Sequence, residues 1–132
     1  MNNTFFKRLL VVTSGIGAVG VMAGAFGAHF LKTRLPVNDL ETIKTGVLYL
    51  FVHVLATLVV IAIAKEGVGA KWLRITGITF ITGIILFSGS LFLLATQSLT
   101  GLPAASIGFV TPLGGLCFII GWLSLLMFSL KT

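Results

Sequence analysis

The stretch LLVVTSGIGAVGVMAGAFGAHFL, residues 9–31, decides the fold of this chain. It contains no charged residue, and a helix of about 20 apolar residues is long enough to cross the hydrocarbon core of a bilayer. Three later stretches have the same character, at residues 45–64, 75–96 and 107–130. The sequence therefore predicts an all-α integral membrane protein, with residues 1–132 forming one domain of four transmembrane helices.

The composition indicates the same class of protein. Hydrophobic residues make up 57% of the chain and charged residues 9%, whereas a soluble domain carries about 25% charged residues. The mean hydropathy is +1.14. A protein of this composition cannot expose its whole surface to water, so the lipid bilayer is expected to cover most of that surface.

The net charge of +6 does not indicate nucleic-acid binding. The basic residues lie at the ends of the apolar stretches, where they anchor helices and set their orientation. Cys117 is the single cysteine, which excludes an internal disulfide and disfavours a thiolate metal site. We therefore predict no cofactor, no metal site and no nucleic-acid partner.

The distribution of basic residues predicts the orientation in the membrane. The ends of the chain and the second loop lie on one side and carry six basic residues: Lys7, Arg8, Lys65, Lys71, Arg74 and Lys131. The other side carries only Lys32, Arg34 and Lys44. Because cytoplasmic loops are richer in Lys and Arg, both termini are expected in the cytoplasm of a multi-pass protein of the bacterial inner (plasma) membrane.

The polar segment at residues 32–44 is expected to join the first two spans. Pro36 would stop the first helix, and Asn38 or Asp39 would cap a new one. Glu41 would lie in the first turn of that helix, where the helix dipole favours a carboxylate. The sequence thus predicts a short interfacial helix that runs into the second span.

Small residues recur on the first span with helical spacing. Gly20, Gly24, Gly27 and Ala28 form neighbouring faces on which helix backbones can approach closely. Two interpretations stay open at this point: packing within the bundle, or self-association of the protein. In either case, the first helix is expected to be the central helix and the least exposed to lipid.

A polar cluster is the second candidate site. Five polar side chains fall in the half of the spans away from the termini: His29, Tyr49, His53, Ser88 and Ser90. An ionisable residue inside a membrane indicates a functional site. The alternative is that a neutral imidazole bonds a hydroxyl or carbonyl group and ties helices together.

The spans contain no Asp, Glu, Lys or Arg, which argues against an ion-coupled transporter. Ser88 and His53 resemble part of a hydrolase site, but no carboxylate is placed to orient the histidine. We therefore expect no enzymatic activity.

Five segments resemble the YgdD/YwdK family of small bacterial inner-membrane proteins, a domain of unknown function. They are GAFGAH at 24–29, TGVLYLFVH at 45–53, LFSGSL at 86–91, TPLGG at 111–115 and GW at 121–122. The resemblance implies a four-helix membrane protein and supplies no chemistry. Members often have glycine where Phe30 stands and a polar residue where Leu50 stands.

Two functions remain. The first is a non-enzymatic structural or accessory component of a membrane assembly, as a homo-oligomer or within a larger complex. The alternative is a transporter or binder of a small neutral or lipid-like molecule that uses the polar cluster.

Overall fold

The computed structural model describes residues 4–64, 67, 69–103 and 106–131. Within these residues all regular structure is helical, and four helical runs are long and apolar enough to cross a membrane. The prediction of an all-α membrane protein with four spans is confirmed. Lys65, which the orientation prediction uses, lies outside the described residues.

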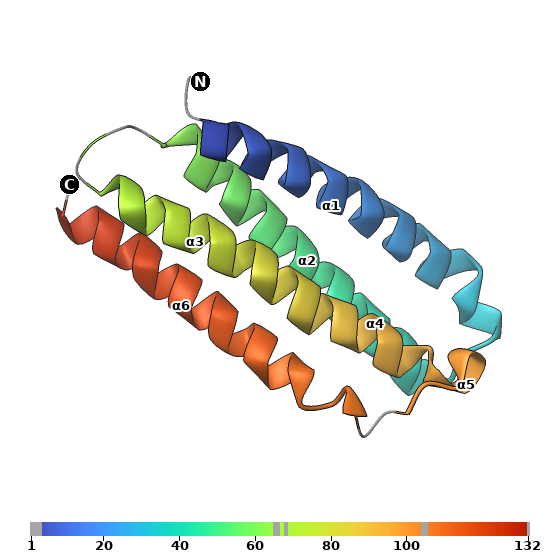
Figure 1. Ribbon diagram of the computed structural model, residues 1–132. Helices are drawn as coiled ribbons and strands as arrows, with labels where there is room; N and C mark the ends of the chain where they lie inside the picture. The colour runs from blue at the N-terminus through green and yellow to red at the C-terminus, as the bar shows by residue number, and fades with distance from the viewer. Residues whose placement is uncertain (1–3, 65–66, 68, 104–105, 132) are drawn as a thin grey trace.

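The elements follow one another along the chain as four long runs with short connections (Figure 1). The third run is made of three consecutive pieces, α3, η2 and α4. The bounds are α1 Thr4–His29, η1 Leu31–Thr33, α2 Val37–Ala62, α3 Ala70–Gly83, η2 Ile84–Ser88, α4 Gly89–Ala95, α5 Gln97–Thr100 and α6 Val110–Lys131.

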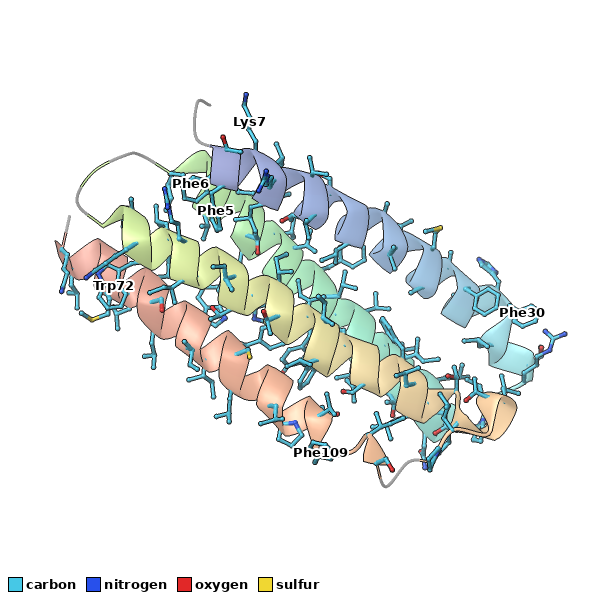
Figure 2. All side chains as sticks on the ribbon, in the orientation of Figure 1. Phe5, Phe6, Lys7, Phe30, Trp72 and Phe109 are labelled. Atoms are coloured by element: carbon cyan, nitrogen blue, oxygen red, sulfur yellow. The ribbon has the colours of Figure 1, made fainter. Side chains whose placement is uncertain are left out.

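The start of α1 and the end of α6 lie at the same end of the bundle, which we call the terminal end (Figure 1). The opposite end, with η1 and α5, is the η1 end. Lys7 and Trp72 lie near the terminal end, and Phe30 lies near the η1 end (Figure 2).

The helix predicted to begin between the first two spans is present as the start of α2. The polar residues after Pro36 form its first turns and run directly into the second span, and a 3-10 turn, Leu31–Thr33, precedes Pro36. Pro36 occupies the capping position, which Asn38 or Asp39 was expected to fill. Proline suits a helix start because its fixed φ is compatible with the first turn and its missing N–H needs no partner there.

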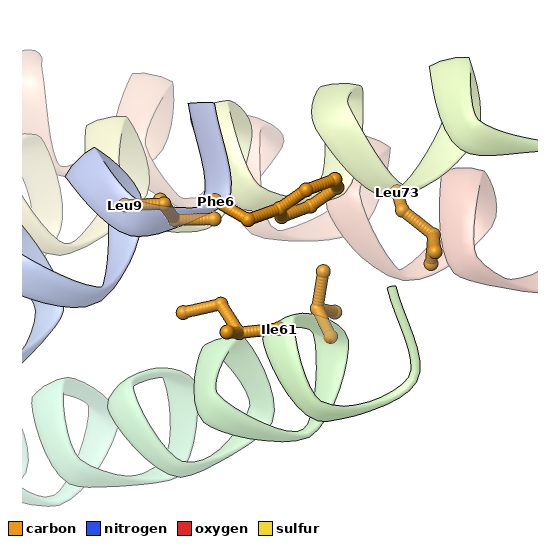
Figure 3. Packing of buried hydrophobic residues seen from close by; sticks show 5 residues of the cluster. Phe6, Leu9, Ile61 and Leu73 are labelled. Atoms are coloured by element: carbon orange, nitrogen blue, oxygen red, sulfur yellow. The ribbon is translucent and has the colours of Figure 1, made fainter. Parts of the chain in front are cut away.

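The helices differ in how many neighbours they contact. α6 lies along α3 and η2, α2 lies along α3 and α4, and α1 lies along α2. At the terminal end, α1 also reaches the third run. Phe6 and Leu9 of α1 pack there with Ile61 of α2 and Leu73 of α3 in one buried cluster (Figure 3).

The expectation that α1 is the central helix is wrong. In its most apolar window 17% of the residues are buried, against 39% for α2, which is the central helix. The small residues of α1 supply one narrow face. Its other faces carry large side chains such as Val11, Val21 and Met22, which are more than half exposed. A stripe of glycines therefore allows one close contact and does not place a helix at the centre.

The third run contains a π-helical turn at Ile84–Ser88. A π turn bonds residue i to i+5 and so holds one residue more than an α-helical turn. Gly83 precedes the turn and Gly89 follows it. The turn lies against α6 on one side and α2 on the other, so it changes which side chains face those helices.

Candidate functional site

His53 is the buried ionisable residue among the five polar residues singled out from the sequence. It lies on α2, and its side chain is 3% exposed. Its Nδ1 atom is 2.8 Å from the carbonyl oxygen of Tyr49, one turn earlier in α2. Because a carbonyl oxygen can only accept, Nδ1 carries the proton and donates it to Tyr49.

The other ring nitrogen of His53 is held by α6. The indole N–H of Trp122 donates to Nε2 across 3.2 Å. An indole N–H can only donate, so Nε2 carries no proton. These two partners fix a neutral imidazole with both nitrogens engaged, and the geometry favours a histidine that ties two helices together.

Aromatic rings surround His53 and join α2 to α6. The imidazole stacks on Phe118, with ring centroids 3.5 Å apart and an angle of 9° between the planes. Phe80 of α3 meets the same imidazole edge-on at 5.1 Å. Tyr49 packs on Phe87 of η2 at 4.5 Å. The imidazole of His53 is thus surrounded mainly by apolar aromatic side chains, which keep other hydrogen-bonding groups away from its two hydrogen bonds.

A hollow of about 590 Å³ adjoins this group between α2 and α6. Tyr49 and His53 border it on one side, and Gly115 borders it on the other. A methyl group at Gly115 would meet nothing within 4 Å. Leu116 and Ile119 also line the hollow and are more than half exposed, so it opens at the surface that faces lipid.

The two predicted serines have partners of their own. Ser88 donates across 2.7 Å to the carbonyl oxygen of Gly46 on α2. Ser90 donates to the carbonyl oxygen of Phe87 at 2.9 Å, so the hydroxyl of Thr111, at 2.6 Å, donates to Ser90. Neither serine bonds His53. Instead, Ser88 links the third run to α2, and Ser90 links it to α6.

His29 lies apart from the other predicted polar residues. It ends α1 and is exposed. Within the described part of the chain, no hydrogen bond or ring contact joins it to Tyr49, His53, Ser88 or Ser90. The structure therefore brings Tyr49 and His53 together and leaves the two serines and His29 in separate places. Nor do three His, Cys, Asp or Glu side chains among the described residues meet as a metal site would need.

The glycine stripe of α1 faces α2. A methyl group at Gly20 would overlap the end of the Leu50 side chain and lie 3.1 Å from Phe51. At Gly24 it would lie 3.6 Å from Val47, and at Gly27 it would lie 3.0 Å from Ile43. These three glycines therefore serve packing within the bundle.

Ala28, the fourth predicted packing residue, is exposed. It borders a second hollow, of about 410 Å³, between α1 and α2 near the η1 end.

A third hollow separates α1 from the third run. It measures about 430 Å³ and is lined almost entirely by apolar side chains, with Leu50 of α2 among them. Gly15 borders it on α1 and Gly89 on α4, and a methyl group at either glycine would meet nothing within 4 Å. We call it the α1–α4 groove.

Comparison with known proteins shows where the chain belongs. A family model described as "Protein of unknown function (DUF423)" matches residues 23–115, which is well over half of the chain. This chain belongs to the DUF423 family. The family resemblance read from the sequence is thereby confirmed.

Several curated DUF423 relatives cover most of the chain. "UPF0382 membrane protein YwdK" of Bacillus subtilis is 35% identical over 94% of this chain and 98% of its own length. A "UPF0382 membrane protein" of Haemophilus influenzae is 38% identical over 93% of this chain and 92% of its own. "UPF0382 inner membrane protein YgdD" of Escherichia coli is 33% identical over 95% and 92%. No solved structure matches.

The four spans and these relatives assign the DUF423 chain to the inner membrane as a multi-pass protein, as predicted.

Sequence reasoning missed Trp122 and Phe118 as partners of His53. A signal for them exists in the spacing. Phe118 and Trp122 are four residues apart on α6, as Tyr49 and His53 are on α2, so each pair lies on one helix face. Two such aromatic pairs on different spans indicate rings that can pack against each other.

Proposed function

We propose that this protein is a non-enzymatic accessory component of a membrane assembly, and that it acts by packing sideways against another transmembrane helix. The observation that carries the proposal is the α1–α4 groove. Its lining is apolar, it lies along two spans, and glycines on both walls leave room for a backbone to approach. Small residues of this kind favour helix association in lipid, where van der Waals contact replaces the missing hydrophobic drive.

The interior of the bundle supports a non-enzymatic role. Buried hydroxyl groups there donate to backbone carbonyl groups: Thr13 and Thr57 bond carbonyl groups of their own helices, and Ser88 bonds one of α2. The hydroxyl of Ser88 and the nitrogens of His53 have different partners, so they do not form a nucleophile and base pair.

The packing proposal can be tested with variants whose added side chains fill the α1–α4 groove. Gly15→Leu and Gly89→Leu each add a side chain into open space in the α1–α4 groove, and leucine suits a helix at least as well as glycine does. Ala18→Leu is the matched control, because Ala18 is exposed on α1 and does not border the groove.

The measurement is purification from native membranes in a lipid-preserving polymer, followed by size analysis and mass spectrometry of what is retained. We expect a homo-oligomer or a stoichiometric protein partner with the wild type and with Ala18→Leu, and its loss with both glycine variants. A strictly monomeric wild-type particle in native lipid would contradict the proposal.

We also propose that both termini lie in the cytoplasm. The terminal end carries five described basic residues and the η1 end three, which is the asymmetry that retains the terminal end inside. A reporter that is active only in the periplasm, fused after the C-terminus, should stay inactive. The same reporter inserted between α1 and α2 should be active, and the reverse result would overturn the orientation.

A second candidate function rests on the hollow beside Tyr49 and His53. Its size and aromatic lining suit a small neutral or lipid-like molecule that enters from the membrane. Gly115→Leu would fill this hollow, whereas Gly15→Leu would leave it open. A molecule that co-purifies with the wild type and Gly15→Leu but not with Gly115→Leu would support binding here. Its retention by Gly115→Leu would remove the candidate.

A further inference from the structure

The hollow that Ala28 borders differs from the other two in carrying charge. It lies between α1 and α2 near the η1 end and measures about 410 Å³. Its apolar wall combines Gly24, Gly27 and Ala28 of α1 with side chains of α2 that include Ile43 and Val47. The small residues leave α1 without side-chain bulk here, so an acyl chain can lie against an apolar wall.

Two lysines border the same hollow. Lys32 comes from η1, and Lys44 comes from the second turn of α2. Both lie toward the η1 end, and long lysine side chains at the ends of membrane helices extend to the headgroup level. The hollow therefore has an apolar body and a cationic mouth.

These lysines are not explained by membrane orientation. The asymmetry that retains the terminal end in the cytoplasm is weakened by every basic residue at the η1 end. The third basic residue there, Arg34, is engaged elsewhere: its guanidinium lies 3.7 Å from the ring centre of Phe30 and donates to the Phe30 carbonyl group. Lys32 has no ion pair within the described part of the chain, and Lys44 pairs with exposed Glu41.

We propose that this hollow binds an anionic phospholipid, with one acyl chain against Gly24, Gly27 and Ala28 and the phosphate between Lys32 and Lys44. Charge complementarity selects an anionic headgroup, since clustered basic residues beside a membrane helix attract anionic lipids. The apolar wall selects a lipid over free phosphate, which would gain nothing from it. This site is separate from the α1–α4 groove, so it stands or falls independently of the proposed function.

The experiment measures lipid retention by native mass spectrometry of the full chain in detergent, titrated with phosphatidylglycerol or phosphatidylcholine. The wild type should retain phosphatidylglycerol at least about tenfold better than phosphatidylcholine, because the cationic choline of phosphatidylcholine offsets the attraction between its phosphate and the lysines, whereas phosphatidylglycerol has a net negative charge. The double variant Lys32→Gln/Lys44→Gln should lose that preference. The control Lys71→Gln/Lys131→Gln removes the same charge at the terminal end and should keep it.

Two further variants keep the test decisive if the lysine double variant folds poorly. Glu41→Gln releases Lys44 from its ion pair and should strengthen phosphatidylglycerol binding. Ala28→Leu fills the hollow and should weaken it. An added excess of inorganic phosphate should not displace the lipid. The proposal is overturned by equal retention of the two lipids, by wild-type binding in Ala28→Leu, or by displacement with phosphate alone.

Discussion

The contact between the third run and α6 and the contact between α1 and α2 both place glycines between helices, but the atoms that those glycines meet differ. On α6, a methyl group at Gly114 would overlap the backbone nitrogen of Phe87 and lie 2.8 Å from its Cα. On α1, the glycines of the stripe meet only side chains of α2, such as the end of Leu50. Backbone cannot move aside, whereas the end of a leucine can.

Hydrogen bonds follow the same division. The hydroxyl of Thr76 on α3 shares its one proton between the carbonyl oxygen of Trp72 in its own helix, at 2.9 Å, and that of Gly121 on α6, at 3.3 Å. Thr111 of α6 donates to Ser90 of α4. No side-chain hydrogen bond between described residues joins α1 to α2. The third run and α6 thus form a rigid pair, and α1 is a peripheral helix that packs on α2 through apolar side chains and small residues. This difference teaches that the number of glycines in a span does not measure how firmly the span is held.

The largest expected effect is at the rigid contact. Gly114→Val should lower the free energy of unfolding by about 3 kcal/mol, because the added carbons meet the backbone of Phe87 and α6 must move away. Unfolding by increasing SDS in mixed micelles would measure the loss. Gly115→Val is the matched control, since its neighbourhood is open. Equal loss in both variants would break the comparison between the two contacts.

A smaller loss of stability is expected at Gly121 of α6, which faces the ring of Phe80 on α3. At Gly121 a methyl group would lie 2.5 Å from Cδ1 of Phe80 and 2.8 Å from the hydroxyl oxygen of Thr79. Gly121→Ala should cost about 2 kcal/mol in the same assay, because the ring is buried and has little space to turn. Gly121→Ala in a Phe80→Leu background should cost less, which would show that the ring is the obstacle.

The hydrogen bond between Trp122 of α6 and His53 of α2 should contribute still less to the free energy of unfolding. Trp122→Phe keeps most of the ring contact but removes the donor to Nε2 of His53, and should cost about 1 kcal/mol. The double variant His53→Phe/Trp122→Phe removes both partners and should lose less than the sum of the single variants. Additive losses would show that the hydrogen bond contributes nothing.

The smallest effect is expected on α1. Gly24→Ala places a methyl group 3.6 Å from Val47, which is an ordinary contact distance, so stability should change by less than about 0.5 kcal/mol. A loss as large as that at Gly121 would show that α1 is held as rigidly as α6. The control is Gly15→Ala, the same substitution on the same helix at a position where the methyl group would meet nothing within 4 Å.

The sequence predicted the spans because an uncharged apolar stretch of that length has few other stable solutions. It also predicted the family, from segments such as GAFGAH. The peripheral position of α1 could not be predicted in this way. Gly20, Gly24 and Gly27 show that a close contact exists, but not whether the other faces of the helix are covered.

The candidate site was less accessible to prediction than the fold. Tyr49 and His53 share one face of α2 by spacing alone, so their proximity could be read from the sequence. The partner of His53 is 69 residues away, at Trp122 on α6, and depends on how the helices cross. The serines bond carbonyl groups of Gly46 and Phe87, and any sequence supplies such acceptors at every position.

Because of the π turn at Ile84–Ser88, the packing of the third span depends on its exact number of residues. Removing one residue there would restore an α-helical turn and rotate all later residues of the span by about 100°. Ser90 would then turn away from Thr111 and Phe92 away from Gly46, against which it packs. A single-residue deletion between 84 and 88 would thus change the contacts of Ser90 with α6 and of Phe92 with α2 together.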